Sequence, residues 1–247
     1  MQLVDECFFK VKTASFKYIS SQENNKEKFK NKDRMIRSFL IPICFWISKK
    51  AKKKSPLIIG LGGGQGSGKT TITSILSLIL KKYFKLKVFK ISIDDFYKTR
   101  KERKTLSENK HPLLLTRGVP GTHDINIMLD FFINIKVKSF KSLKWRQFVN
   151  FQLKTKYKKL YKQLDGLLYL NAKNFNLLKK WRTKQEKKLR LKAKNKKNLK
   201  IMNKKEIISF MQTYQRITEQ MFKDAPKYSS IIMNLNRNHQ IQKIRFN

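Results

Sequence analysis

The chain has 247 residues, of which 40% are hydrophobic and 12% aromatic, so it can build one large domain with a substantial core, which excludes wholesale disorder. Its formal net charge is +42. Because the excess is mostly lysine spread from end to end, we interpret it as a biased surface that also attracts anionic substrates, and a nucleic-acid-binding protein is the open alternative.

Cysteine usage and hydropathy bear on the compartment. The two cysteines, Cys7 and Cys44, lack the spacing of a metal site or a redox pair, which favours a reduced, cytoplasmic protein. The longest apolar run, residues 39–47, is too short to span a bilayer. Asp5 and Glu6 stand where a secretory signal would be basic. We therefore expect a cytoplasmic protein without a membrane partner, and the sequence leaves the oligomeric state open.

The first elements expected along the chain are helical. Residues 1–32 are polar with little periodicity, which predicts a loosely held extension. From Asp33 to Lys50 the apolar residues recur at helical spacing, which predicts a helix interrupted near Pro42. Residues 1–55 are therefore predicted to form an N-terminal helical extension, and residues 56–247 the main domain.

A strand–helix–strand unit follows. Residues 57–61 read as a buried strand, 69–83 as an amphipathic helix and 88–93 as a second strand, which implies a parallel sheet with a right-handed crossover. Further downstream the pattern predicts helices over 145–161 and 173–194 and another that begins after Asn203, and strands over 164–170 and 230–235. The predicted class is α/β, with a parallel sheet flanked by helices.

The turn after the first strand is rich in glycine, and it holds six of the chain's 9 glycines within residues 60–68. Its residues match the pattern G-x-x-x-x-G-K-[ST] in full. Glycine lets backbone N–H groups approach a polyphosphate, Lys69 can reach its β- and γ-phosphates, and Thr70 can offer a hydroxyl to Mg²⁺. We predict ATP and Mg²⁺ as cofactors, and the alternative is a chance match. The predicted binding residues are Gly63, Gly64, Gln65, Gly66, Ser67, Gly68, Lys69, Thr70 and Thr71.

Two carboxylates, Asp94 and Asp95, follow the second predicted strand. Ligands of an open α/β sheet gather at the carboxyl ends of its strands, so we expect this pair at the same crevice as the phosphate loop. One carboxylate could accept the proton of an acceptor hydroxyl while the other helps to hold the metal. The alternative is a pair of aspartates that only ends a strand and begins a turn.

These motifs together resemble the branch of P-loop kinases that contains uridine kinase, phosphoribulokinase and pantothenate kinase. The segments His111–Leu114 and Arg117–Asp124 are similar to D-glycerate 3-kinase and its kinase-like relatives, and the resemblance runs from about Phe39 onward. It implies a P-loop kinase domain over residues 56–247 that uses ATP to phosphorylate a small anionic hydroxy acid, with D-glycerate as the leading acceptor.

The resemblance also implies residue roles. Asp94 would be the general base and, with Thr70, a metal ligand, while Lys69 would act in catalysis. Arg182 falls where the branch has a phosphate-sensing lid. The residues implied to contact the acceptor are Asp95, Tyr97, Arg117 and His123. The guanidinium fork of Arg117 suits a carboxylate. The alternatives are a turn arginine paired with Asp124 and a histidine satisfied within its loop.

The chain departs from the family over residues 125–144. The family has there a further strand that ends in acidic residues, and a Glu-Gly-Trp stretch, and this sequence contains neither. We interpret the difference as an internal deletion near residues 135–145. Such a deletion would remove a strand of the sheet, a carboxylate for Mg²⁺ and contacts to the acceptor. A nucleotide-binding remnant with impaired or lost turnover is therefore an alternative to an active kinase.

Overall fold

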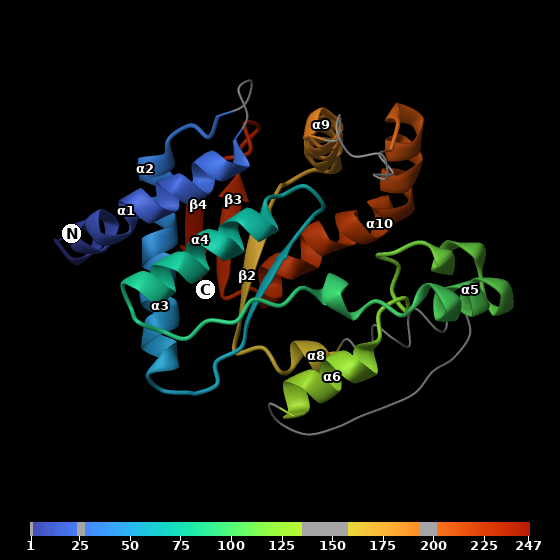
Figure 1. Ribbon diagram of the computed structural model, residues 1–247, viewed down its shortest axis with the longest axis horizontal. Helices are drawn as coiled ribbons and strands as arrows, with labels where there is room; N and C mark the ends of the chain where they lie inside the picture. Colours follow the sequence, from blue (N-terminus) through green and yellow to red (C-terminus); the bar gives the residue numbers. More distant parts are fainter. Residues whose placement is uncertain (1, 24–27, 135–157, 193–201) are drawn as a thin grey trace. The chain divides into compact units, whose positions relative to one another are not determined.

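The computed structural model describes residues 2–23, 28–134, 158–192 and 202–247 (Figure 1). Their contacts divide the chain into two compact units. The first comprises Met1–Ser55, Ile59–Val88 and Gly166–Asn247, and the second comprises Pro56–Ile58 and Phe89–Asp165. The residues predicted as an N-terminal extension thus belong to the first unit, together with the phosphate loop, while Asp94 belongs to the second.

A mixed sheet of 4 strands forms the centre of the first unit, in the order β1-β2-β3-β4. Its strands are β1 (Ile59–Gly63), β2 (Gly166–Asn171), β3 (Ile231–Leu235) and β4 (Ile241–Phe246). The strands β1, β2 and β3 are parallel to one another, and β4 is antiparallel to β3. The α/β class and the strands expected near 57–61, 164–170 and 230–235 are confirmed, with shifts of one or two residues. The sequence did not predict β4.

The strand predicted over residues 88–93 is wrong. Residues 88–92 belong to no strand, and Ile93 already opens a short 3-10 helix. The side chain of Phe89 is 88% exposed and that of Ile91 is 39% exposed. β-branched and aromatic residues favour a strand only where a neighbouring strand and a packed face receive them. Among the described residues no strand pairs with this segment, so its β propensity is not realised.

Helices cover the sheet of the first unit. Helix α4 (Lys69–Lys82) lies against β1, and the helices α1 (Gln2–Gln22) and α3 (Ile41–Ala51) pack on α4 (Figure 1). The prediction of a loosely held segment over residues 1–32 is wrong for α1. Its inward side chains are fully or almost fully buried, namely those of Cys7, Phe8, Val11, Ser15 and Ile19.

The predicted interruption near Pro42 takes the form of a wider helical turn. A short helix, α2 (Lys32–Arg34), leads into the π-helical segment η1 (Met35–Leu40), which continues directly into α3 with Pro42 in its first turn. Proline lacks a backbone N–H and its ring crowds the preceding turn, so a wider turn before it keeps the helical path.

Helices α9 (Phe175–Lys192) and α10 (Lys204–Tyr228) follow β2, and α10 packs on both β2 and α9. The predicted helix start at Asn203 is confirmed. The Asn203 side-chain oxygen Oδ1 accepts a hydrogen bond from the Glu206 N–H at 3.0 Å, and the Glu206 carboxylate accepts one from the Asn203 N–H at 2.7 Å. Most of the helix predicted over 145–161 lies outside the described residues.

The second unit consists of short helices and turns. Its elements are η2 (Ile93–Phe96), α5 (Arg100–Asn109), η3 (Pro112–Leu115), α6 (Ile125–Asn134) and α8 (Lys158–Tyr161). A small apolar cluster joins α6 and α8 through Ile125, Met128, Leu129 and Leu160. In the described part of the chain, no helix is long and apolar enough to cross a membrane.

Candidate active site

The phosphate loop connects β1 to α4 and follows a backbone path that requires glycine. Gly66 and Gly68 have φ angles of 75° and 90°, which L side chains rarely adopt, and Gly68 is the N-cap of α4. The Lys69 ammonium donates hydrogen bonds to the carbonyl oxygens of Gly63 and Gly64, each at 2.9 Å. The lysine is therefore held at the mouth of its own loop, beside the N-terminus of α4, where an anion is favoured.

Helix α9 packs directly on this loop. A Cβ atom added to Gly64 would lie 2.2 Å from a methyl group of Leu178, and Leu178 is 1% exposed. A Cβ atom on Gly66 would lie 3.2 Å from the backbone nitrogen of Arg182. The loop glycines thus allow a close approach of the α9 backbone as well as of a phosphate. This helix is the one on which the sequence placed the lid arginine.

The loop and α9 present buried polar atoms without a protein partner. The Gln65 side-chain oxygen Oε1, the Ser67 hydroxyl and the Arg182 Nε atom have no hydrogen-bond partner among the described residues, and Ser67 is 2% exposed. Buried polar groups are normally paired, so these atoms fit a site that a polar ligand completes. The remaining guanidinium atoms of Arg182 bond to Gln185 and Glu186 on the same helix.

The donor set also fits Mg²⁺ held partly by a nucleotide. The described residues contain no group of three or more His, Cys, Asp or Glu side chains that could hold a metal ion. Mg²⁺ needs no such cage, because it commonly keeps several waters and takes one or two protein oxygens in addition to phosphate oxygens. Thr70 directly follows Lys69 at the start of α4, which is where such an oxygen is required.

In the second unit, Asp94 lies in the short helix η2, and its side chain is 68% exposed. The Tyr97 hydroxyl donates a hydrogen bond to Asp94 Oδ1 at 2.9 Å, and His123 Nε2 lies 4.0 Å from the same oxygen. Asp95 has a different surrounding, since its carboxylate accepts a hydrogen bond from the Ser92 N–H at 2.8 Å in a capping box. The structure thus leaves Asp94 open to solvent while Asp95 stabilises the turn.

Three side chains form a layered stack beside Asp94. The rings of Tyr97 and His123 are stacked with their centroids 4.3 Å apart, and the Arg117 guanidinium lies 5.4 Å from the centre of the Tyr97 ring. Tyr97 and His123 also form an isolated antiparallel bridge, which fixes their backbones. The structure therefore brings Asp94, the predicted base, together with Tyr97, Arg117 and His123, three of the four residues predicted to contact the acceptor.

Burial controls the charge of His123. The residue is 7% exposed, and desolvation lowers the pKa of its imidazole to about 4, although the nearby Asp94 carboxylate acts in the opposite direction. His123 is therefore neutral at physiological pH. A neutral imidazole can orient a carboxylate or an acceptor oxygen without placing a buried positive charge beside the stack.

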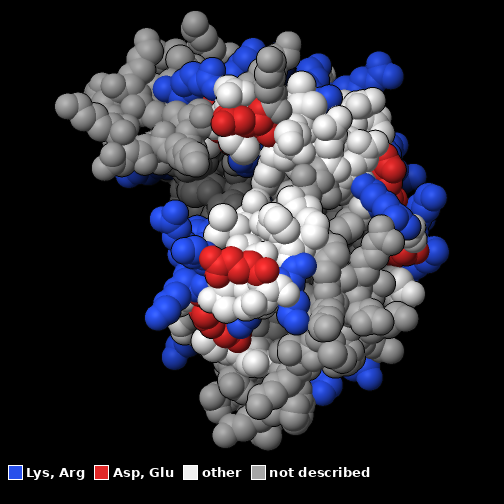
Figure 2. Space-filling view, turned by 90° about the vertical axis from the view of Figure 1, so that its right-hand side faces the viewer, with Lys and Arg blue, Asp and Glu red and all other residues white. Residues whose placement is uncertain are grey.

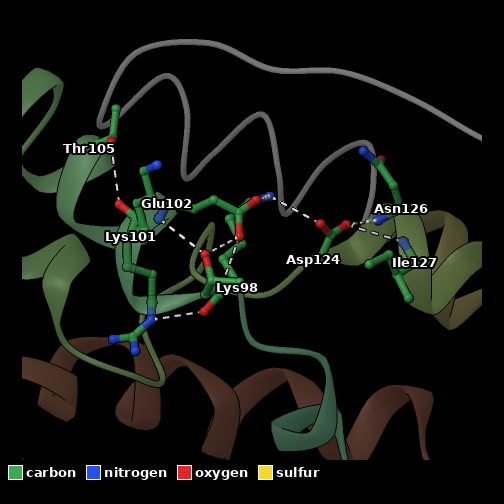
Figure 3. Close-up of polar contacts among 9 residues, drawn as sticks. Lys98, Lys101, Glu102, Thr105, Asp124, Asn126 and Ile127 are labelled. Carbon is green, nitrogen blue, oxygen red and sulfur yellow. Dashed lines mark hydrogen bonds and ion pairs between the residues drawn. The ribbon is translucent and has the colours of Figure 1, made fainter.

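The segment that carries His123 is tied back to its surroundings by polar contacts (Figure 3). Asp124 accepts hydrogen bonds from the backbone N–H groups of Asn126 and Ile127, both at 3.1 Å, at the beginning of α6. The Lys98 ammonium lies 3.3 Å from Asp124 and 3.9 Å from Glu102 (Figure 3). These contacts link the segment after Tyr97 to the beginning of α6 and hold His123 in place.

The sequence did not single out two residues that contact the phosphate loop. Leu178 on α9 fills the space above Gly64, and His239 in the turn between β3 and β4 lies against Gly68. Leu178 belongs to an ordinary apolar stripe, so no local pattern sets it apart. His239 is far from the loop in sequence, and only the sheet order brings the two together.

Comparison with known proteins agrees with the motifs, although no protein-family model matches the chain. An uncharacterised kinase of Schizosaccharomyces pombe is 39% identical over 89 residues, which cover 35% of this chain and 32% of the relative. A chloroplastic D-glycerate 3-kinase of Arabidopsis thaliana is 33% identical over 105 residues, which cover 37% and 23% respectively. A pantothenate kinase of Lactococcus lactis is 32% identical over 89 residues, which cover 36% and 28%.

The chain thus spans less than a third of the length of each of these relatives. Among solved structures, the D-glycerate 3-kinase of Cryptococcus neoformans has a TM-score of 0.65 at 20% sequence identity, with 84% of this chain and 97% of that chain covered. At this identity the likeness establishes the fold. Over about a third of its length the chain is thus similar to kinases that include D-glycerate 3-kinase and pantothenate kinase, and its fold is like that of a P-loop kinase-like protein.

Proposed function

We propose that the chain binds ATP with Mg²⁺ at the residues Gly63–Thr71. The observation that carries this proposal is the loop itself, in which glycines with positive φ precede the N-terminus of α4. Among the described residues, the buried side-chain oxygens of Gln65 and Ser67 have no hydrogen-bond partner there. In this role Lys69 exchanges the loop carbonyls for the β- and γ-phosphates, and Thr70 offers its hydroxyl to the metal. Mg²⁺–ATP, when bound, supplies the phosphoryl group and neutralises part of its charge.

The reaction that we propose is phosphoryl transfer to a hydroxyl group, with Asp94 as the general base. Asp94 is accessible, and its Oδ1 atom is oriented by the Tyr97 hydroxyl. An ionised carboxylate in this setting can orient the acceptor hydroxyl and take its proton as the oxygen attacks. Asp95 is a weaker candidate for contact with the acceptor, because its carboxylate is already bonded within the turn.

The acceptor that we propose is a small hydroxy acid, with D-glycerate first. Arg117 can pair with a carboxylate in a bidentate way, and the neutral His123 can donate or accept a hydrogen bond at a hydroxyl. Two of the similar proteins are named D-glycerate 3-kinase, and one of them shares the fold over 84% of this chain, which supports this choice. The cytoplasmic compartment stays a prediction from the two cysteines.

One observation favours a second candidate, a nucleotide-binding remnant without turnover. Among the described strands, β1 is paired only with β2, and the strand expected at residues 88–93 is not formed. Both features agree with the segment that the sequence lacks between residues 125 and 144. A chain of this kind would keep the phosphate loop and lose part of the metal and acceptor contacts.

Calorimetry with Mg²⁺–ATP tests the binding proposal. We expect saturable binding by the natural chain and, for Lys69→Ala, an affinity lower by about 10- to 100-fold, because a charge-assisted hydrogen bond contributes about 1.5–3 kcal/mol. Equal binding by the two proteins, or no binding by either, would refute the proposed site. Lys81→Ala, at the other end of α4, removes the same charge and serves as the control.

An ATP-consumption screen over small hydroxy acids and nucleosides tests the reaction. D-Glycerate should stimulate consumption, and Asp94→Asn should reduce the rate by about 10²- to 10⁴-fold. An unchanged rate in Asp94→Asn would exclude its role as the base. Binding of nucleotide without consumption for any acceptor would establish the remnant instead of the kinase.

A further inference from the structure

The turn between β3 and β4 delivers a histidine to the phosphate loop. This turn is closed by Asn236, whose side-chain oxygen accepts hydrogen bonds from the N–H groups of Asn238 and Gln240, both at 3.0 Å, and whose carbonyl oxygen accepts one from His239 at 3.0 Å. His239 has a φ angle of 64°, a conformation that asparagine and glycine adopt more readily. The turn is therefore built tightly, and its histidine has a fixed direction.

His239 contacts the loop and α9 at the same time. Its Nε2 atom lies 3.5 Å from the place of a Cβ atom on Gly68, and its ring stacks on Trp181 with centroids 4.2 Å apart and planes 13° apart. Trp181 is 4% exposed, and its carbonyl carbon lies 3.3 Å from the place of a Cβ atom on Gly66. The loop, α9 and the turn thus meet through one pair of stacked rings.

A hydrogen bond with the loop backbone completes the contact. Burial of the imidazole against the loop and the Trp181 ring lowers the pKa of His239, and a hydrogen bond with the Ser67 backbone opposes this effect, as expected when the imidazole donates the bond. His239 as a whole residue is exposed and does not belong to the buried core of the first unit. His239 therefore contacts the phosphate loop at Ser67 and Gly68 without being a core residue, which suits it to fix the conformation of the loop.

We propose that His239 is a positioning residue for the phosphate loop, acting through the Trp181 ring and the Ser67 backbone to hold the loop in the shape that receives a triphosphate. The inference rests on the proposed function, because the shape matters through nucleotide affinity. A loop already held in its binding conformation loses less conformational entropy when the ligand binds. His239 would thus act as a brace, meaning a residue that increases affinity for the ligand without touching it. The partner surface is the same chain, and the ligand class is a nucleoside triphosphate with Mg²⁺.

The experiment compares three variants in the full-length chain. His239→Asn tolerates the positive φ but removes the stacked ring, His239→Phe keeps a ring over Trp181, and Asn238→Ala changes an exposed neighbour in the same turn. Calorimetry gives the affinity for Mg²⁺–ATP, urea unfolding gives stability, and hydrogen exchange in the ligand-free protein gives the protection of the amides over residues 66–69. The three measurements separate a local brace from a general loss of stability.

We expect His239→Asn to weaken Mg²⁺–ATP binding about tenfold and to speed exchange of the loop amides, with an unfolding midpoint equal to that of the natural chain. His239→Phe should restore most of the affinity, and Asn238→Ala should bind as the natural chain does. Equal affinity and equal exchange in His239→Asn would overturn the inference while the proposed function stands. If the natural chain binds no Mg²⁺–ATP, the proposed function fails, and unchanged exchange of the loop amides would then overturn the brace as well.

Discussion

At Gly64 the phosphate loop passes so close to α9 that there is no room for the methyl group of an alanine. A Cβ atom there would lie 2.2 Å from Leu178, which is itself 1% exposed and cannot move to solvent. We therefore expect Gly64→Ala to lower the free energy of unfolding by about 1–3 kcal/mol, as overpacking of a filled interior does. Urea unfolding followed by circular dichroism measures this loss.

The double variant Gly64→Ala/Leu178→Ala is the matched test of that contact. Leu178→Ala alone opens a cavity and should cost about 2–5 kcal/mol. In the double variant the new methyl group enters the vacated space, so the combined loss should be smaller than the sum of the two single losses. Strictly additive losses would show that the two residues do not meet in solution.

The burial of His123 predicts a pH dependence of stability. Its pKa is about 4 in the folded protein, against the ordinary value of 6.5 for an exposed imidazole, so below pH 6.5 the unfolded chain binds more protons than the folded one. The stabilisation that the neutral form provides is complete above pH 6.5 and is lost as the pH falls toward 4. From pH 7 to pH 5 the loss should be about 2 kcal/mol.

His123→Gln, which does not titrate, is the control for this dependence. Urea unfolding at pH 7 and pH 5 should show a larger fall in stability for the natural chain than for His123→Gln, with the difference near 2 kcal/mol. Identical falls for the two proteins would mean that the imidazole is solvated, and the ring stack with Tyr97 would then not hold in solution.

At the scale of elements, the packing of α1, a helix that the sequence did not predict, should contribute strongly to the stability of the first unit. Phe8 is 1% exposed and Phe9, its neighbour, is 69% exposed. The same substitution at the two positions therefore compares a buried with an exposed phenylalanine in one helix. We expect Phe8→Ala to lower the free energy of unfolding by about 3–5 kcal/mol and Phe9→Ala to change it by less than about 1 kcal/mol. Equal effects would show that α1 is not packed on the first unit.

The sequence predicted those elements whose signals are local. A capping box at Asn203 and Glu206 marked the start of α10, and the glycine-rich pattern marked the turn between β1 and α4. The helix α1 was not predicted because its buried face includes Cys7 and Ser15, which weaken the apolar periodicity of a lysine-containing segment. Residues 88–93 were assigned to a strand because propensity was present, yet a strand also requires a partner, and propensity cannot report one.

The candidate site shows the same division between local and distant information. Lys69 and Asp94 were found because each belongs to a short motif, and the structure then grouped Asp94 with Tyr97, Arg117 and His123. The pair itself did not show that Asp95 forms a capping box while Asp94 stays exposed, since both aspartates follow the same segment. His239 reaches the loop only through the pairing of β3 with β2, which no short pattern encodes.

At the scale of the whole molecule, charge is the dominant property. The formal net charge is +42, and Figure 2 shows lysine and arginine side chains around a face on which acidic side chains form only small clusters. Such a field attracts polyanions from a distance and is screened by salt, since the Debye length falls from about 10 Å at 0.1 M to about 3 Å at 1 M.

We therefore expect the association rate of Mg²⁺–ATP to fall severalfold between 50 mM and 300 mM KCl, with little change in the dissociation rate, because steering acts on the encounter. Stopped-flow binding with a fluorescent ATP analogue measures both rates. The corresponding uncharged nucleoside analogue should show no salt dependence in its affinity. A dissociation rate that carries the whole salt effect would contradict steering.

The order of strands has a consequence for synthesis on the ribosome. Strand β1 pairs with β2, which is completed only at Asn171, and β2 pairs in turn with β3, which ends at Leu235. When the phosphate loop of a nascent chain has just emerged, β1 has no neighbouring strand, and the side of α4 that faces the sheet stays incompletely covered while translation continues. During that interval the growing polypeptide should depend on chaperones, and premature termination within α10 should yield insoluble fragments, since β3 and its hairpin would never form.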